Sequence, residues 1–241
     1  ELEVGDSLKT SGNSSAEITF FDGSTMELLA DTQIEILSLD IVCSSGVTTI
    51  SLLQTIGDTI SHVTEILDPA SSYEIDTPSG TAGVRGSGLR VRVVYFHPEY
   101  PDGTALITNL EGNIYAIAQG VQVDVPVGQT CILTPGEPPN LMPVAEDDSA
   151  STLERHPTTI PVLDNDFDLD DDTLSIASVT QGDNGDVENN GSDVTYIPDV
   201  EFHGTDRFTY TVSDGHGGTD TAIVTVTVNV VETLADIRVA L

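Results

Sequence analysis

The chain has 241 residues and carries 40 Asp and Glu against 7 Lys and Arg, a formal net charge of −33. Binding to nucleic acid or to an anionic membrane surface needs clustered cations, so this balance argues against both. Hydrophobic residues make up 38% of the chain, which is enough for a core, and the excess of acids favours bound counter-cations such as Ca²⁺.

Runs rich in β-branched and aromatic residues recur along the chain, separated by Gly, Asp, Asn or Pro. This pattern predicts an all-β protein. The segment 57–67 has apolar residues at helical spacing and is expected to form one short helix. No apolar run approaches the ~18 residues of a membrane-spanning helix, so we expect no membrane insertion. The expected strands are 16–21, 25–29, 33–37, 48–53, 90–95, 105–110, 113–118, 122–125, 193–197, 207–212 and 221–228.

Three separated motifs in the first half of the chain carry a family resemblance. They are AEITFFDGS at 16–24, TPSGTAGVRGS at 77–87 and LEGNI at 110–114, followed by a closing Gly-Glu pair. Over about 15–137 the chain resembles the FecR domain, in the versions found in surface proteins of bacteria of the Chloroflexus type. The resemblance implies an extracytoplasmic all-β domain. Within it, Arg85 is either a structural ion-pairing residue or a recognition residue.

The two cysteines, Cys43 and Cys131, fit no metal-binding or redox spacing. They either form one disulfide that closes a long loop, as suits an oxidising exterior, or remain two buried thiols. The five histidines are scattered and match no zinc motif, and we interpret them as surface or turn residues.

Composition changes near residue 138, where the sequence TPGEPPN is rich in proline and polar residues. We expect a linker at 138–142 between a first domain at 1–137 and a second at 143–229. The first domain holds 19 acids and 4 cations, and residues 142–241 hold 21 acids and 3 cations. The second part is therefore the more acidic, although it is shorter.

Residues 143–228 carry a second resemblance. The matching stretches are PVAEDD at 143–148, VLDNDFDLDDDTL at 162–174 and FHGTDRFTYTVSDGHGGTD at 202–220. They resemble a cadherin-like bacterial immunoglobulin-type repeat, of the kind strung in tandem through large surface adhesins. The resemblance implies an immunoglobulin-like β-sandwich, and the short strands with turn residues between them favour seven strands.

Six aspartates of this second domain crowd into the nine residues from 164 to 172. Ca²⁺ takes six to eight hard oxygen ligands, and Asp at every second position directs several carboxylates inward from one loop. We therefore predict a Ca²⁺ site at one pole of the sandwich, where acids of the domain entrance and of the Ser-Asp-Gly turn converge. The alternative is a solvated acidic loop without a defined ion. The expected metal ligands are Asp147, Asp148, Asp164, Asp166, Asp168, Asp170, Asp172 and Asp214.

The chain has no Gly-x-Ser-x-Gly elbow, no zinc-protease motif and no tryptophan, so we expect no enzyme activity. We expect an extracellular structural or adhesive protein at the cell surface, such as the subunit of a filament or layer. The alternative, implied by the resemblance of the first domain, is the ectodomain of a cell-surface signalling regulator of the anti-sigma type.

The last segment, 230–241, has too many apolar residues to be a solvent-exposed tail without a structural role. It is either a linker into a further domain or a strand that pairs with an exposed sheet edge of another subunit. Pairing of this kind does not close and builds a polymer, so we expect self-association or binding to other surface proteins. The chain begins at Glu1 without an initiator Met, which we interpret as a processed or trimmed form.

Overall fold

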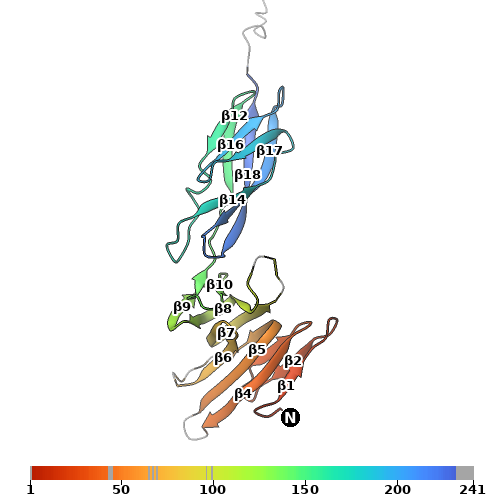
Figure 1. Ribbon diagram of the computed structural model, residues 1–241, viewed down its shortest axis with the longest axis vertical. Coiled ribbons are helices and arrows are strands. Elements are labelled where there is room, and N and C mark those ends of the chain that lie inside the picture. Colours follow the sequence, from red (N-terminus) through yellow and green to blue (C-terminus); the bar gives the residue numbers. More distant parts are fainter. Residues whose placement is uncertain are drawn as a thin grey trace, which may run out of the picture. The chain divides into compact units, whose positions relative to one another are not determined.

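Figure 1 shows a computed structural model of the chain. The structure describes residues 2–42, 46–64, 66, 68, 70–95, 97–98 and 100–231, without the side chains of residues 86 and 87. The described residues form strands and connecting loops, and among them is no helix long and apolar enough to cross a membrane. The chain divides into two compact units, 1–141 and 142–241, each with its own apolar core.

The first unit is built on one sheet, with eleven strands among its described residues. The hydrogen-bonded path runs β1-β4-β5-β6-β7-β8-β10-β11, and β2, β3 and β9 attach beside it. Most neighbours are antiparallel, but β5 and β6 run parallel. The strands are β1 (Ser7–Lys9), β2 (Ala16–Thr19), β3 (Thr25–Leu28), β4 (Gln33–Val42), β5 (Val47–His62), β6 (Ser72–Thr77), β7 (Gly80–Val94), β8 (Thr104–Ala118), β9 (Val121–Val125), β10 (Thr130–Leu133) and β11 (Asn140–Leu141).

The core of this unit lies against one face of the sheet. Its strands alternate buried apolar residues with more exposed ones, as expected where one face is packed and the other meets water. Thus β6 buries Tyr73 and Ile75, while β7 buries Leu89, Val91 and Val93. All five belong to one apolar cluster, so the residues between them point away from the core.

The helix expected at 57–67 is wrong. Strand β5 continues to His62, pairing with β3 on one side and β7 on the other. The apolar pattern misled because this strand buries two hydroxyl residues: Thr59 donates to the side-chain oxygen of Gln54 (2.8 Å), and Ser61 accepts from the Tyr73 hydroxyl (3.1 Å). Buried polar groups that are satisfied in this way break the link between hydropathy and burial.

Three further expectations concern the linker, the cysteines and the last segment. Of the expected linker 138–142, Asn140 and Leu141 form strand β11, because Leu141 is buried in the core of the first unit. Cys131 is buried in β10, but Cys43 lies outside the described residues. A disulfide between them therefore stays a prediction. Residues 232–241, which hold most of the expected pairing strand, also lie outside them.

The second unit is a sandwich of two sheets, with seven strands among its described residues, as predicted. One sheet has the order β12-β18-β17-β14 and the other β13-β16-β15. The aromatic residues Tyr196, Phe208 and Tyr210 are buried between them. The all-β prediction is therefore confirmed in both units. The strands are β12 (Asp148–Leu153), β13 (Thr158–Ile160), β14 (Ser175–Val179), β15 (Gly185–Asn189), β16 (Val194–Pro198), β17 (Gly204–Ser213) and β18 (Thr219–Asn229).

Candidate metal centre

The acidic loop of the second unit connects β13 in one sheet with β14 in the other, and so crosses an end of the sandwich. Its middle is fixed by a two-way backbone bridge: the amide of Val144 donates to the carbonyl of Phe167 (2.9 Å), and the amide of Phe167 donates back (3.1 Å). The bridge therefore fixes the backbone at Phe167 and so positions the aspartates that follow it in the loop.

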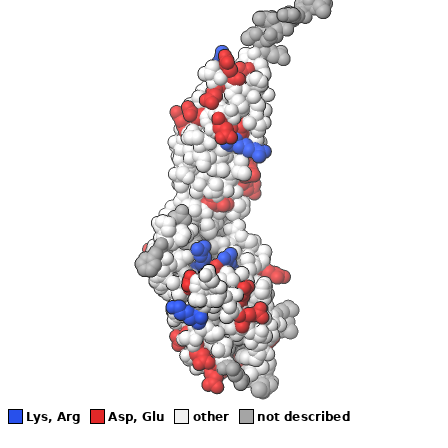
Figure 2. Space-filling model, turned by 90° about the vertical axis from the view of Figure 1, so that its right-hand side faces the viewer, with Lys and Arg blue, Asp and Glu red and all other residues white. Residues whose placement is uncertain are grey.

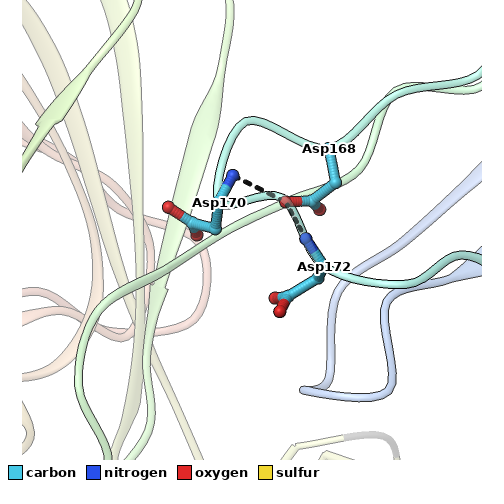
Figure 3. A group of neighbouring side chains, drawn as sticks. All are labelled: Asp168, Asp170 and Asp172. Carbon is cyan, nitrogen blue, oxygen red and sulfur yellow. Dashed lines mark hydrogen bonds between the residues drawn. The ribbon is translucent and has the colours of Figure 1, made fainter.

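Asp168, Asp170 and Asp172 come together directly after that bridge (Figure 3). One carboxylate oxygen from each lies within 4.8 Å of the others. The Oδ1 atom of Asp168 accepts hydrogen bonds from the amides of Asp170 (2.7 Å) and Asp172 (3.5 Å), which curls the loop around it. Asp171 has a left-handed backbone (φ 62°), a conformation that Asp tolerates better than most residues.

The second oxygen of Asp168, Oδ2, is buried and has no hydrogen-bond partner. Burial raises the pKa of Asp168, as do the nearby charges of Asp172 and Asp170, while the two backbone amides lower it. A buried carboxylate oxygen without a partner carries a desolvation cost that a cation would remove. Three converging carboxylates with one such oxygen fit a hard divalent cation, so this group has the chemistry to bind a metal ion.

A second acidic group surrounds the hydroxyl of Tyr210 on β17. This hydroxyl lies 2.9 Å from both carboxylate oxygens of Asp166 and 2.9 Å from the carbonyl of Val162, and its single proton serves one of them at a time. Burial raises the pKa of Asp148 to about 6, against a hydrogen bond with Tyr210 that lowers it, and the charge of Asp166 raises it further. The Oδ2 atom of Asp148 is also buried without a partner.

Two family models match the chain, one for each unit. Residues 6–115 match the FecR protein family, and residues 140–227 match a bacterial Ig domain. The chain joins a FecR domain to a bacterial Ig domain. Both resemblances predicted from the sequence are thereby confirmed, in the predicted order, and neither matched family model is that of an enzyme. We call the two parts the FecR unit (1–141) and the Ig unit (142–241).

Solved structures add only distant likenesses. Two crystal structures of a candidate anti-sigma factor from Parabacteroides distasonis match at 10% identity with a TM-score of 0.44, covering 61% of this chain and 78% of that one. An endo-fucoidan hydrolase of glycoside hydrolase family 107 matches at 14% identity with a TM-score of 0.29, over 91% of this chain and 34% of that one. Likenesses this distant carry no functional argument. No curated protein matches the chain.

The Ig unit does not bring all eight predicted metal residues into one group. Among its described residues, only Asp168, Asp170 and Asp172 form a group of three or more acids whose ligand atoms lie close enough to share an ion. Asp147 accepts a hydrogen bond from the amide of Ile223 (2.8 Å), and Asp164 is exposed. Spacing along the chain groups these acids, but their carboxylates serve different parts of the sandwich.

Asp214 has a structural contact of its own. It is 4% exposed, and its carboxylate accepts from the amides of His216 (2.7 Å) and Gly218 (3.0 Å), which closes the hairpin between β17 and β18. The hairpin still reaches the acidic loop, because Nε2 of His216 lies 3.6 Å from Oδ1 of Asp172. Asp214 thus shapes a turn beside the candidate metal centre.

Two features of the Ig unit escaped sequence reasoning. Tyr210 reads as a core residue in an alternating strand, and nothing in the pattern shows its hydroxyl facing Asp166. Asp206 is buried, which raises its pKa, but bonds from the Tyr196 hydroxyl (2.8 Å) and the amide of Asn184 (2.9 Å), among others, lower the pKa below its ordinary value. Asp206 is therefore a satisfied structural carboxylate.

Proposed function

We propose that the chain is the ectodomain of a cell-surface signalling regulator. The FecR unit recognises a partner protein, and the Ig unit serves as a structural support for the FecR unit. The match of residues 6–115 to the FecR family is the observation that supports this role. The family resemblance of the Ig unit agrees with a position outside the cytoplasm. The adhesive or filament-forming role expected from the sequence has no comparable support.

In-frame deletions in the source organism test this proposal. Deletion of residues 6–115 is expected to change the transcript levels of a defined set of genes, measured by RNA sequencing. Deletion of residues 142–229 serves as the control for loss of a surface module of similar size. If neither deletion alters transcription and both alter attachment of cells to a surface, the chain is an adhesive protein and the proposal is wrong.

We also propose that Asp168, Asp170 and Asp172 hold Ca²⁺ in the Ig unit. Three converging carboxylates, a loop that curls around Oδ1 of Asp168 and the buried Oδ2 of the same residue support a hard cation that prefers oxygen ligands. The ion would neutralise the repulsion between these acids and fix the loop that connects the two sheets. Its role would be structural, because the loop that it would fix connects β13 in one sheet with β14 in the other.

A further inference from the structure

Strand β7 of the FecR unit carries three of the seven cations of the chain: Arg85, Arg90 and Arg92. The FecR unit has only one other, Lys9, and 19 acids among residues 1–137. Figure 2 shows Lys and Arg side chains gathered on one face of this unit, with acidic side chains beside them. We call the outward side chains of Arg85, Arg90 and Arg92 the arginine face.

A β-bulge sets all three arginines on the same side of the strand. Residues 85 and 90 differ by an odd number of positions, so in a regular strand they would point to opposite faces. The register with β8 shifts between Val84 and Ser87, where β7 holds one extra residue. Val84 and Leu89 both face the core, and Arg85 and Arg90 therefore both face outward. Bulges commonly re-aim a side chain in this way.

The arginine face is held in place at Arg85 by an aromatic platform. The guanidinium carbon of Arg85 lies 5.9 Å from the centre of the Tyr115 ring, within range of a cation–π interaction. That ring lies across Gly83, where a Cβ atom would overlap it, and its hydroxyl donates to Oε1 of Glu74 (2.9 Å). Three neighbouring strands thus fix the ring on which Arg85 rests.

Arg90 is fixed in a different way. Its Nε donates to both carboxylate oxygens of Asp58 on β5 (2.9 and 3.2 Å), and its Nη2 contacts Oδ2 of the same residue. By contrast, neither Arg85 nor Arg92 forms an ion pair with any carboxylate that the structure describes. Both are exposed, so their charges are available to a ligand.

Two surface hollows adjoin the arginine face. One, of about 560 Å³, is lined by Arg85 and Tyr115 together with the hairpin of β8 and β9. The other, of about 520 Å³, is lined by Arg90, Arg92 and Asp58. Each hollow combines an arginine with carboxylate and apolar residues. Mixed linings of this kind suit side chains of a protein better than a uniform polyanion.

We propose that the arginine face is the docking surface for an acidic segment of a partner protein. Without these three arginines, residues 1–137 hold 19 acids and the single cation Lys9, a net charge of −18, which repels an acidic partner, whereas β7 attracts it. Charge thereby selects both the partner and its orientation. The inference rests on the proposed regulatory function, because the protein that docks here would be the partner that signals to the FecR unit.

Peptide binding to the full chain tests the docking surface. The probe is a peptide of about ten residues that alternates Glu and Thr and carries a neutral dye, long enough when extended to span residues 85–92. We expect fluorescence anisotropy to show binding at about 20 mM NaCl and much weaker binding at about 300 mM NaCl. A peptide that alternates Gln and Thr should not bind.

Single variants assign the binding to the arginine face. Arg85→Gln and Arg92→Gln should each lower the affinity for the Glu-Thr peptide by about tenfold. Lys9→Gln changes the net charge equally, lies on β1 and should change affinity by less than about twofold. Arg90 is left intact because its pair with Asp58 joins β7 to β5.

Three results would overturn the inference. They are an absence of peptide binding at low salt, an equal loss in Lys9→Gln, and binding of a sulfated polysaccharide at Arg85 and Arg92 where the peptide does not bind. None of them bears on whether deletion of residues 6–115 changes transcription, so failure of the docking surface and failure of the regulatory role are separate outcomes.

Discussion

Two buried carboxylate oxygens without partners, on Asp168 and Asp148, mark the least satisfied positions of the Ig unit. Each belongs to a group of acids whose mutual repulsion adds to the cost of burial. The two differ in surroundings, because Asp168 has Asp170 and Asp172 as neighbours whereas Asp148 lies near a tyrosine hydroxyl. They therefore respond differently to a cation and to protons.

Removal of Ca²⁺ should destabilise the Ig unit and leave the FecR unit unchanged. An ion that binds only the folded state contributes about 2.7 kcal/mol at a hundredfold excess over its Kd. Hydrogen–deuterium exchange of the full chain, with Ca²⁺ or with a chelator, should show faster exchange in peptides of 160–176 after chelation. Asp170→Asn and Asp172→Asn should reproduce that effect, whereas Asp186→Asn, an exposed strand residue, should not. Identical exchange with and without Ca²⁺ would contradict the site.

Acidification should stabilise the Ig unit in the presence of a chelator. The folded-state pKa of Asp148, about 6, lies above its ordinary value of 3.8, so its ionised form costs stability above pH 6. That cost is relieved as the pH falls from 6 towards 3.8. Below that range Asp206, whose pKa is lowered, begins to lose its stabilising contribution. Thermal unfolding followed by calorimetry measures the change, and Asp148→Asn should abolish most of it.

Individual site residues were only partly predictable from the sequence. The alternating aspartates indicated a group of acids in this loop, and the carboxylates of Asp168, Asp170 and Asp172 do lie together, whereas whether they bind an ion stays a prediction. Asp214 was expected beside them, but its carboxylate is engaged by the amides of its own hairpin. Sequence spacing does not reveal which backbone amides a carboxylate will meet, and that contact decides whether it is available as a ligand.

At the scale of single elements, β7 shows how a local irregularity creates a surface. The VRG motif was recognised in the sequence, but the bulge within it was not, because a strand pattern does not indicate where an extra residue will be placed. The same limit applied to β5, whose buried Thr59 and Ser61 hid a strand behind a helical pattern. Periodicity predicts regular elements and misses their exceptions.

Substitution of Gly83 tests the platform beneath Arg85. A Cβ at this position would overlap the ring of Tyr115, so Gly83→Ala must displace the ring that supports Arg85. We expect the FecR unit to lose about 1–3 kcal/mol of unfolding free energy, measured by urea denaturation. Gly12→Ala is the control, because its added methyl group meets only the flexible side chain of Asp31 in ordinary contact. Equal stability of both variants would contradict this account of the platform.

At the scale of the whole molecule, the chain combines two acidic β units. Each unit gathers charged side chains of one sign at one place. In the Ig unit the acids converge at Asp168, Asp170 and Asp172, where they favour a cation. In the FecR unit the few cations collect on β7, where they favour an acid. The order of the units was predictable from their motifs, but the eleven-stranded sheet was not, because it depends on long-range pairings such as parallel β5 and β6.

In the proposed function, the FecR unit receives a signal through its arginine face. The most direct measurement is RNA sequencing of the source organism carrying chromosomal Arg85→Gln and Arg92→Gln together, beside Lys9→Gln and the deletion of residues 6–115. We expect the double variant to alter the same genes as the deletion, and Lys9→Gln to leave them unchanged. A double variant with normal surface levels and an unaltered transcript pattern, in cells where the deletion changes that pattern, would contradict it.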